Sequence, residues 1–137
     1  MKILPLICRI LLGLVFIVFG LNAFFHFIPM QPPPPDSAPG QFMAVMIPSG
    51  WMSAVAVLQI GGGVLVLLGG TTPLGLIIVG PIIVNILLFH ICLMNGKGIA
   101  MGVFTAILEI LLIHFYRSSF AGIVTAKAQP TVKAPAV

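Results

Sequence analysis

Four long apolar stretches alternate along the chain with short segments of glycine, proline and polar residues. The stretches cover about residues 3–27, 51–68, 74–93 and 98–116. Each is apolar around its whole circumference and comes close to the ~20 residues with which a helix crosses a ~30 Å hydrocarbon core. Lipid offers no partners to backbone groups, so such spans must be helices. The pattern predicts an all-α fold, a transmembrane four-helix bundle.

The connections between these stretches carry clear breaks. The run Pro32–Pro35 cannot continue a helix and favours an extended polyproline arm. Residues 42–50 are apolar but too few to span, and we expect them to dip into the interface and return. Residues 69–73 and 95–98 are rich in glycine and predict turns.

The composition requires lipid as the solvent. Only 6% of the 137 residues are charged, 60% are hydrophobic, and the mean hydropathy is +1.25. A soluble domain carries about 25% charged residues because its surface faces water. The net charge of +4 comes from scattered basic residues that form no patch for nucleic acid. We expect one transmembrane domain, residues 1–117, in contact with the bilayer, followed by an Ala/Pro/Lys tail, residues 118–137.

The basic residues indicate the orientation of the bundle. Alternate crossing places Lys2, Arg117, Lys127 and Lys133 on one side and Lys97 on the other. Basic residues concentrate on the cytoplasmic side, so both termini and the tail are predicted in the cytoplasm and the proline arm outside. The beginning resembles a signal peptide, but Arg9 interrupts the apolar region, and we interpret this segment as a retained helix.

The same topology separates the two cysteines. Cys8 is expected near the cytoplasmic face and Cys92 near the outer face. A disulfide needs Cα atoms within about 7 Å, so none is predicted.

Two full charges are predicted inside the membrane. Arg9 lies about 9 Å from the cytoplasmic end of the first helix, and Glu109 about 12 Å from that end of the fourth, at ~1.5 Å per residue. An unpaired charge at such a depth costs several kcal/mol. We therefore expect the two side chains to form an ion pair. The alternative is that Glu109 carries protons or contacts a ligand, and without its pair it becomes the strongest functional candidate.

Other polar residues lie at comparable depth. Gln59 and Asn85 fall near the midplane, level with Glu109. Thr105 and Tyr116 share a helical face with Glu109, and this face should point into the bundle. Interhelical hydrogen bonds of about 0.6 kcal/mol each explain these residues singly. The alternative for the group is a shared ligand site.

A third set of polar residues is predicted near the outer face. It consists of Asn22, His26 and His90. Two histidines at one level can bind a metal or haem, but no HxxxH spacing or Cys/His cluster accompanies them, and we predict neither. A quinone fits better, because hydrogen bonding to its carbonyl needs only donors beside an apolar slot.

Glycine and proline positions predict how the helices approach. Gly13 with Gly20, and Gly62 with Gly69, are spaced by seven residues, which suits close packing of backbones in lipid. Pro81 lies in the middle of the third stretch and should kink that helix.

Several of these segments together resemble the DoxX family of small membrane proteins. They are residues 9–20 (RILLGLVFIVFG), 22–29, 59–69 (QIGGGVLVLLG) and 81–90 (PIIVNILLFH). The resemblance implies a bacterial inner-membrane four-helix bundle. The family's name derives from a subunit of an archaeal thiosulfate:quinone oxidoreductase, which implies a link to membrane redox complexes. Family members often carry an acidic residue where this chain has Gln59, so no proton or cation role is carried over to that position.

The resemblance and the residues lead to one main functional hypothesis and two alternatives. The main hypothesis is a redox-associated membrane protein that contacts quinone. The alternatives are a non-catalytic accessory subunit of a larger membrane complex and a small permease that uses the Gly-Pro kink. No phosphate loop, nucleophile–base pair or carboxylate pair is visible. No catalytic residue is therefore predicted.

Overall fold

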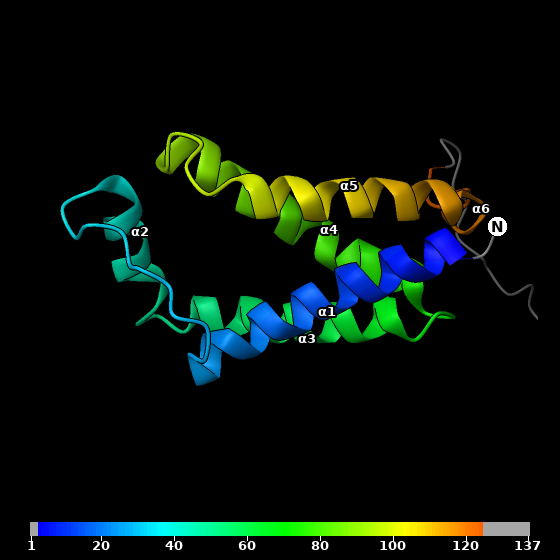
Figure 1. Ribbon diagram of the computed structural model, residues 1–137, viewed down its shortest axis with the longest axis horizontal. Helices are drawn as coiled ribbons and strands as arrows, with labels where there is room; N and C mark the ends of the chain where they lie inside the picture. Colours follow the sequence, from blue (N-terminus) through cyan, green and yellow to red (C-terminus); the bar gives the residue numbers. More distant parts are fainter. Residues whose placement is uncertain (1–2, 125–137) are drawn as a thin grey trace, which may run out of the picture.

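A computed structural model describes residues 3–124 of the chain, and this part is all-helical. The elements are α1 (Ile3–Phe25), α2 (Ala38–Met46), α3 (Trp51–Leu67), α4 (Thr72–Leu88), the π-helix η1 (Phe89–Leu93), α5 (Ala100–Phe115) and α6 (Arg117–Phe120). Helices α1, α3, α4 and α5 run up and down beside one another as a bundle (Figure 1). The predicted all-α transmembrane four-helix bundle is confirmed.

The four long helices differ in how well their lengths match a membrane. By length and composition, Ile3–Phe25 and the continuous helix Thr72–Leu93 can each cross one. Helices α2 and α3 also qualify together, although they meet at a bend of 82°. By themselves, the 17 residues of α3 and the 16 of α5 cover about 26 and 24 Å. Local thinning of a bilayer accommodates helices of this length.

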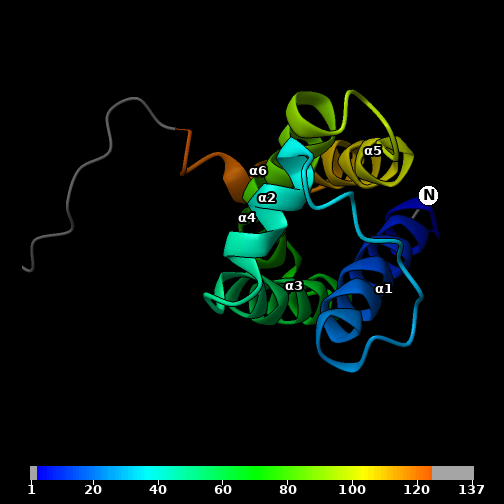
Figure 2. The same ribbon diagram turned by 90° about the vertical axis from the view of Figure 1, so that its left-hand side faces the viewer.

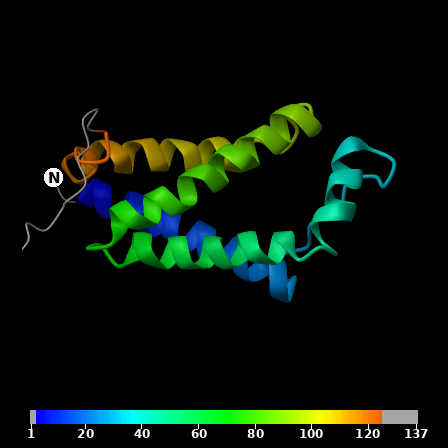
Figure 3. The same cartoon turned by 180° about the vertical axis from the view of Figure 1, so that it is seen from behind.

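The bundle has two distinct ends. The start of α1 lies beside α6 at one end, which we call the terminal end (Figures 1 and 3). The proline arm, α2, η1 and the turn before α5 lie at the opposite, α2 end. The predicted tail begins within α6, and its residues beyond Val124 lie outside the described residues, as does Lys2. Cys8 is near the terminal end and Cys92 near the α2 end, and both are free, as predicted.

A short helix occupies the segment that was expected only to dip into the interface. Ser37 caps α2 by accepting a hydrogen bond from the backbone N–H of Gly40 at 3.2 Å, and Pro39 stands in the first turn. Both features favour a helix start. Gly40 packs against the carbonyl of Pro34, where a side chain would overlap it. As a result α2 lies across the end of the bundle, with the proline arm beside it (Figure 2).

Glycines bring α1, α3 and α4 close together. A Cβ atom added to Gly13 would lie 2.9 Å from the carbonyl oxygen of Gly63. One added to Gly75 would lie 2.9 Å from the carbonyl oxygen of Gly62. The packing role predicted for Gly13 and Gly62 is confirmed. Gly69 differs, because it adopts φ +79° in the turn between α3 and α4 instead of packing two helices.

The buried apolar core fills only part of the bundle. Its side chains come from the first half of α1, the end of α3, the first two-thirds of α4 and the second half of α5. They are Cys8, Leu12, Phe16, Val66, Leu76, Val79, Ile82, Ile83, Leu108 and Leu112. The core therefore lies toward the terminal end. Toward the α2 end the pair α1–α3 separates from the pair α4–α5 (Figures 1 and 3).

Candidate functional site

Arg9 is bound by the end of α3. Its Nε atom donates to the carbonyl of Val66 at 3.2 Å and Nη2 to the carbonyl of Leu67 at 2.7 Å. Carbonyls in the last turn of a helix have no intrahelical donor and form the negative end of the helix dipole, so a guanidinium stabilises them. Gly69 leaves room for this group, because an added Cβ would lie 2.9 Å from Nη2.

The predicted ion pair between Arg9 and Glu109 is therefore wrong. Arg9 donates to α3, and the Oε2 atom of Glu109 is buried without a hydrogen-bond partner among the described residues. Counting residues placed the two at one level, but their side chains have different neighbours. The helix end takes the place of the carboxylate as the partner of the buried cation.

Glu109 lies in the interior, on the predicted face of α5. Its side chain is 6% exposed, Thr105 one turn earlier is 3% exposed, and Tyr116 packs against the apolar core. Thr105 donates its hydroxyl proton to the carbonyls of Met101 or Gly102, at 3.1 and 3.0 Å within α5. The hydroxyl is thus held by its own helix and does not bind the carboxyl group.

The other side of the Glu109 carboxyl faces α4. A Cβ atom added to Gly80 would lie 3.2 Å from Oε1 of Glu109. The next residue is Pro81, which lies inside α4 without ending it and has no backbone N–H to donate. The glycine thus provides the space in which the carboxyl lies. From the sequence, this position was predicted only to be part of a kink.

The other two midplane residues do not join Glu109. Gln59 is half-buried on α3, where its Cβ lies 3.2 Å from the position of a Cβ on Gly20. Asn85 is exposed on α4, five residues beyond Gly80, or about 7.5 Å along the helix. No hydrogen bond links either side chain to Glu109 within the part of the chain that the structure describes. Asn85 belongs instead to a groove at the α2 end.

This groove lies between α2 and the end of α4. It has a volume of about 310 Å³ and is lined by Phe42, Asn85, Leu88, Phe89, Cys92 and Leu93. The rings of Phe42 and Phe89 meet with centroids 5.6 Å apart, which fixes α2 against η1. Asn85 contributes the only amide, and no charged side chain lines the groove. Sequence reasoning singled out Asn85 but not its aromatic neighbours.

The π-helix shapes this groove. The N–H of Met94 donates to the carbonyl of Phe89 at 3.2 Å, across five residues instead of four. His90 bonds through Nδ1 to the carbonyl of Ile86 at 2.8 Å, so Nδ1 donates in this contact. Its Nε2 lies beside Gly98. Wide turns of this kind occur frequently at functional sites.

Asn22 and His26 hold the backbone in place where the chain leaves α1. The Oδ1 atom of Asn22 accepts from the N–H of Ile28 at 2.6 Å, and Nδ2 donates to the carbonyl of Ile28 at 3.4 Å. His26 adopts φ +52°, and its N–H donates to the carbonyl of Asn22. The buried amide thus fixes the chain where it leaves the helix. Within residues 3–124 no three His, Cys, Asp or Glu side chains gather as metal ligands.

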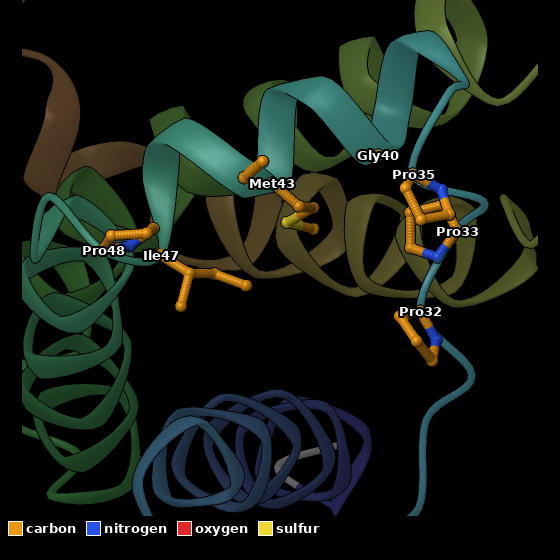
Figure 4. A pocket seen from close by; sticks show the side chains of 8 residues that line it. Pro32, Pro33, Pro35, Gly40, Met43, Ile47 and Pro48 are labelled. Carbon is orange, nitrogen blue, oxygen red and sulfur yellow. The ribbon is translucent and has the colours of Figure 1, made fainter.

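A second hollow lies below α2 (Figure 4). It measures about 350 Å³ and is lined by Pro32, Pro33, Pro35, Gly40, Met43, Ala44, Ile47 and Pro48. No hydrogen-bonding side chain faces it. It lacks the polar group that would orient a ligand.

Comparison with known proteins identifies one family. A sequence model described as DoxX matches residues 4–91, which is more than half of the chain. No curated protein and no solved structure matches.

Proposed function

This chain belongs to the DoxX family, and we propose that it serves a membrane redox process by binding a quinone-type ring in the groove beside Asn85. The observation that supports this best is the composition of the groove, in which aromatic and aliphatic walls surround one amide. Small-molecule sites commonly combine apolar walls with a few polar groups that set orientation. We further propose that the protein lies in the bacterial inner membrane with both termini in the cytoplasm.

The amide of Asn85 suits both redox forms of such a ring. Its NH₂ group can donate to a quinone carbonyl, and its oxygen can accept from a quinol hydroxyl. The rings of Phe42 and Phe89 offer apolar faces and edges for contact with a flat ligand. Because no charged side chain lines the groove, a neutral ring binds there without a counter-ion.

The surroundings suit a ligand that arrives through the bilayer. Leu88 lines the groove with about half of its surface exposed, and Ile91 on the adjacent turn is exposed to a similar degree. Apolar side chains on the outside of a membrane bundle face lipid, so a hydrophobic tail can remain in the bilayer while the ring enters. The proposal is confined to binding, with electron transfer carried out together with other membrane components.

The thiol of Cys92 provides a direct test. It lines the groove and is exposed, whereas Cys8 is buried, so a maleimide should label Cys92 selectively in the folded protein. A short-chain quinone with every ring carbon substituted leaves the thiol no open ring position to add to. This quinone should slow the labelling of Cys92 in the wild-type protein. Asn85→Leu should remove the protection.

Gln59→Leu is the matched control, because it removes another amide from the membrane region but leaves the groove intact. It should retain the protection. An alcohol with the same alkyl chain, but without the ring, should protect poorly. Equal protection by the alcohol, or undiminished protection in Asn85→Leu, would show that the groove does not recognise the ring.

A further inference from the structure

We infer that Glu109 is a proton-binding site inside the bundle, whose proton exchanges with water and which is separate from the groove at Asn85. The chain has two acidic residues. Asp36 is exposed in the arm between α1 and α2, whereas Glu109 is 6% exposed and its Oε2 atom is buried without a partner in the described part. Only one carboxyl of the described chain is therefore inside the bundle.

No cation in the described chain is placed to neutralise Glu109. On α1, Arg9 is bound to carbonyls at the end of α3. On α6, Arg117 is exposed and lies eight residues further along, or about 12 Å. Lys97 is exposed at the α2 end. No ion pair joins any of these residues to Glu109 within residues 3–124.

The other titratable groups on the packed elements are also directed elsewhere. Cys8 belongs to the apolar core, His90 bonds its own helix, and Cys92 lines the groove. His114 is exposed on α5, and Tyr116 lies two turns away from Glu109. None of them donates a hydrogen bond to the carboxyl among the described residues, so a proton on the carboxyl itself is the remaining way to neutralise it.

The chemistry is a reversible protonation. The carboxylate takes a proton from hydronium, which leaves the neutral acid and water, and the reverse step returns the proton to water. An ionised carboxylate in an apolar interior without a counter-ion is strongly disfavoured, whereas the neutral acid is tolerated. The bound proton thus fulfils the role that Arg9 was expected to fulfil.

The position of Glu109 favours exchange from the α2 end. Toward the terminal end, Leu112 belongs to the packed core, while Leu108 precedes Glu109 on the α2 side. Toward the α2 end, the buried positions of α5 beyond Leu108 are Thr105 and Gly102, which are small. On α5 itself, a fluctuation that admits water along Thr105 and Gly102 therefore displaces fewer side-chain atoms than one that passes Leu112.

Infrared spectroscopy can detect both the proton and its exchange. The carbonyl stretch of a protonated carboxyl absorbs apart from that of a carboxylate and shifts when its proton is replaced by deuterium. We expect this band in the full-length protein in an ester-free detergent at neutral pH, and we expect it to shift in D₂O. Glu109→Gln is close in shape to the wild type but has no carboxyl group. This variant should therefore lack the band.

The matched control is Asp36→Asn, which removes the only other acidic side chain and should retain the band and its shift. A spectrum that Glu109→Gln leaves unchanged would show that Glu109 is ionised and would overturn the inference. A band that is lost in Glu109→Gln but does not respond to D₂O would identify a structural acid and would equally exclude exchange. Quinone protection of Cys92 does not depend on either result, so the two proposals can fail separately.

Discussion

The Oε1 atom of Glu109 lies 3.2 Å from the point at which a side chain on Gly80 would begin. This distance is tighter than ordinary van der Waals contact, so the absence of a side chain at one residue makes room for the carboxyl of the other. The relationship links α4 and α5 inside the bundle, next to core residues of both helices. It also predicts that the two positions are coupled in stability.

Gly80→Ala combines two opposing effects. Alanine in place of glycine favours a helix by about 1 kcal/mol, while the new methyl group must push the carboxyl of Glu109 aside. In the Glu109→Ala background the second effect disappears. We therefore expect Gly80→Ala to be more favourable there than in the wild type by about 1 kcal/mol, measured by thermal unfolding in detergent as a double-mutant cycle. Additive effects would show that the contact is absent.

Arg9 and Glu109 should behave as independent residues. Arg9→Met leaves the carbonyl of Leu67 without its side-chain donor and that of Val66 with the Thr72 hydroxyl alone, so it should destabilise the protein by about 1–3 kcal/mol. Glu109→Gln should cost far less, since no cation depends on it. The double variant should show the sum of the two effects in equilibrium unfolding. If the two residues formed a buried ion pair, the double variant would instead be much less destabilised than the sum of the two single variants.

The error about this pair shows what depth alone leaves open. Counting residues placed Arg9 and Glu109 at one level, and this can be read from the sequence. The direction of each side chain depends on which face of its helix meets which neighbour. Arg9 lies one turn before Gly13, whose face packs on α3, so its side chain reaches the end of α3. The spacing of Arg9 and Gly13 on one helical face could therefore have predicted from the sequence that Arg9 meets α3.

The fold was more accessible to prediction than the groove. Four apolar stretches and the breaks between them are properties of the sequence, and lipid leaves helices as the way to satisfy the backbone. The groove instead requires Phe42 to meet Phe89, two residues separated by all of α3 and α4. Its register depends on the cap at Ser37 and on the π-helix, and neither follows from hydropathy.

The orientation in the membrane is testable with single cysteines. The structure places Asp36 in the arm at the α2 end and Ser119 on α6 at the terminal end, both exposed. In a Cys92→Ser background, an impermeant maleimide applied to intact cells should label Asp36→Cys and spare Ser119→Cys. Lysed cells are the control, in which both should react. The opposite pattern in intact cells would place the termini outside and reverse the topology that the basic residues predict.

Two glycines on α3, two residues apart, give a matched test of helix packing. A Cβ on Gly63 would lie 2.8 Å from the carbonyl oxygen of Gly13, which belongs to the backbone and cannot move aside easily. A Cβ on Gly61 would meet nothing within 4 Å. Gly63→Ala should therefore force α1 and α3 apart and destabilise the protein by about 1–3 kcal/mol. Gly61→Ala should be neutral or stabilising by up to about 1 kcal/mol, because only the helix preference of alanine acts there.

Thermal unfolding of both variants in the same detergent measures the difference. Equal stability of the two variants would mean that α3 does not present Gly63 to α1, and the position of Arg9 at the end of the same interface would then also need revision.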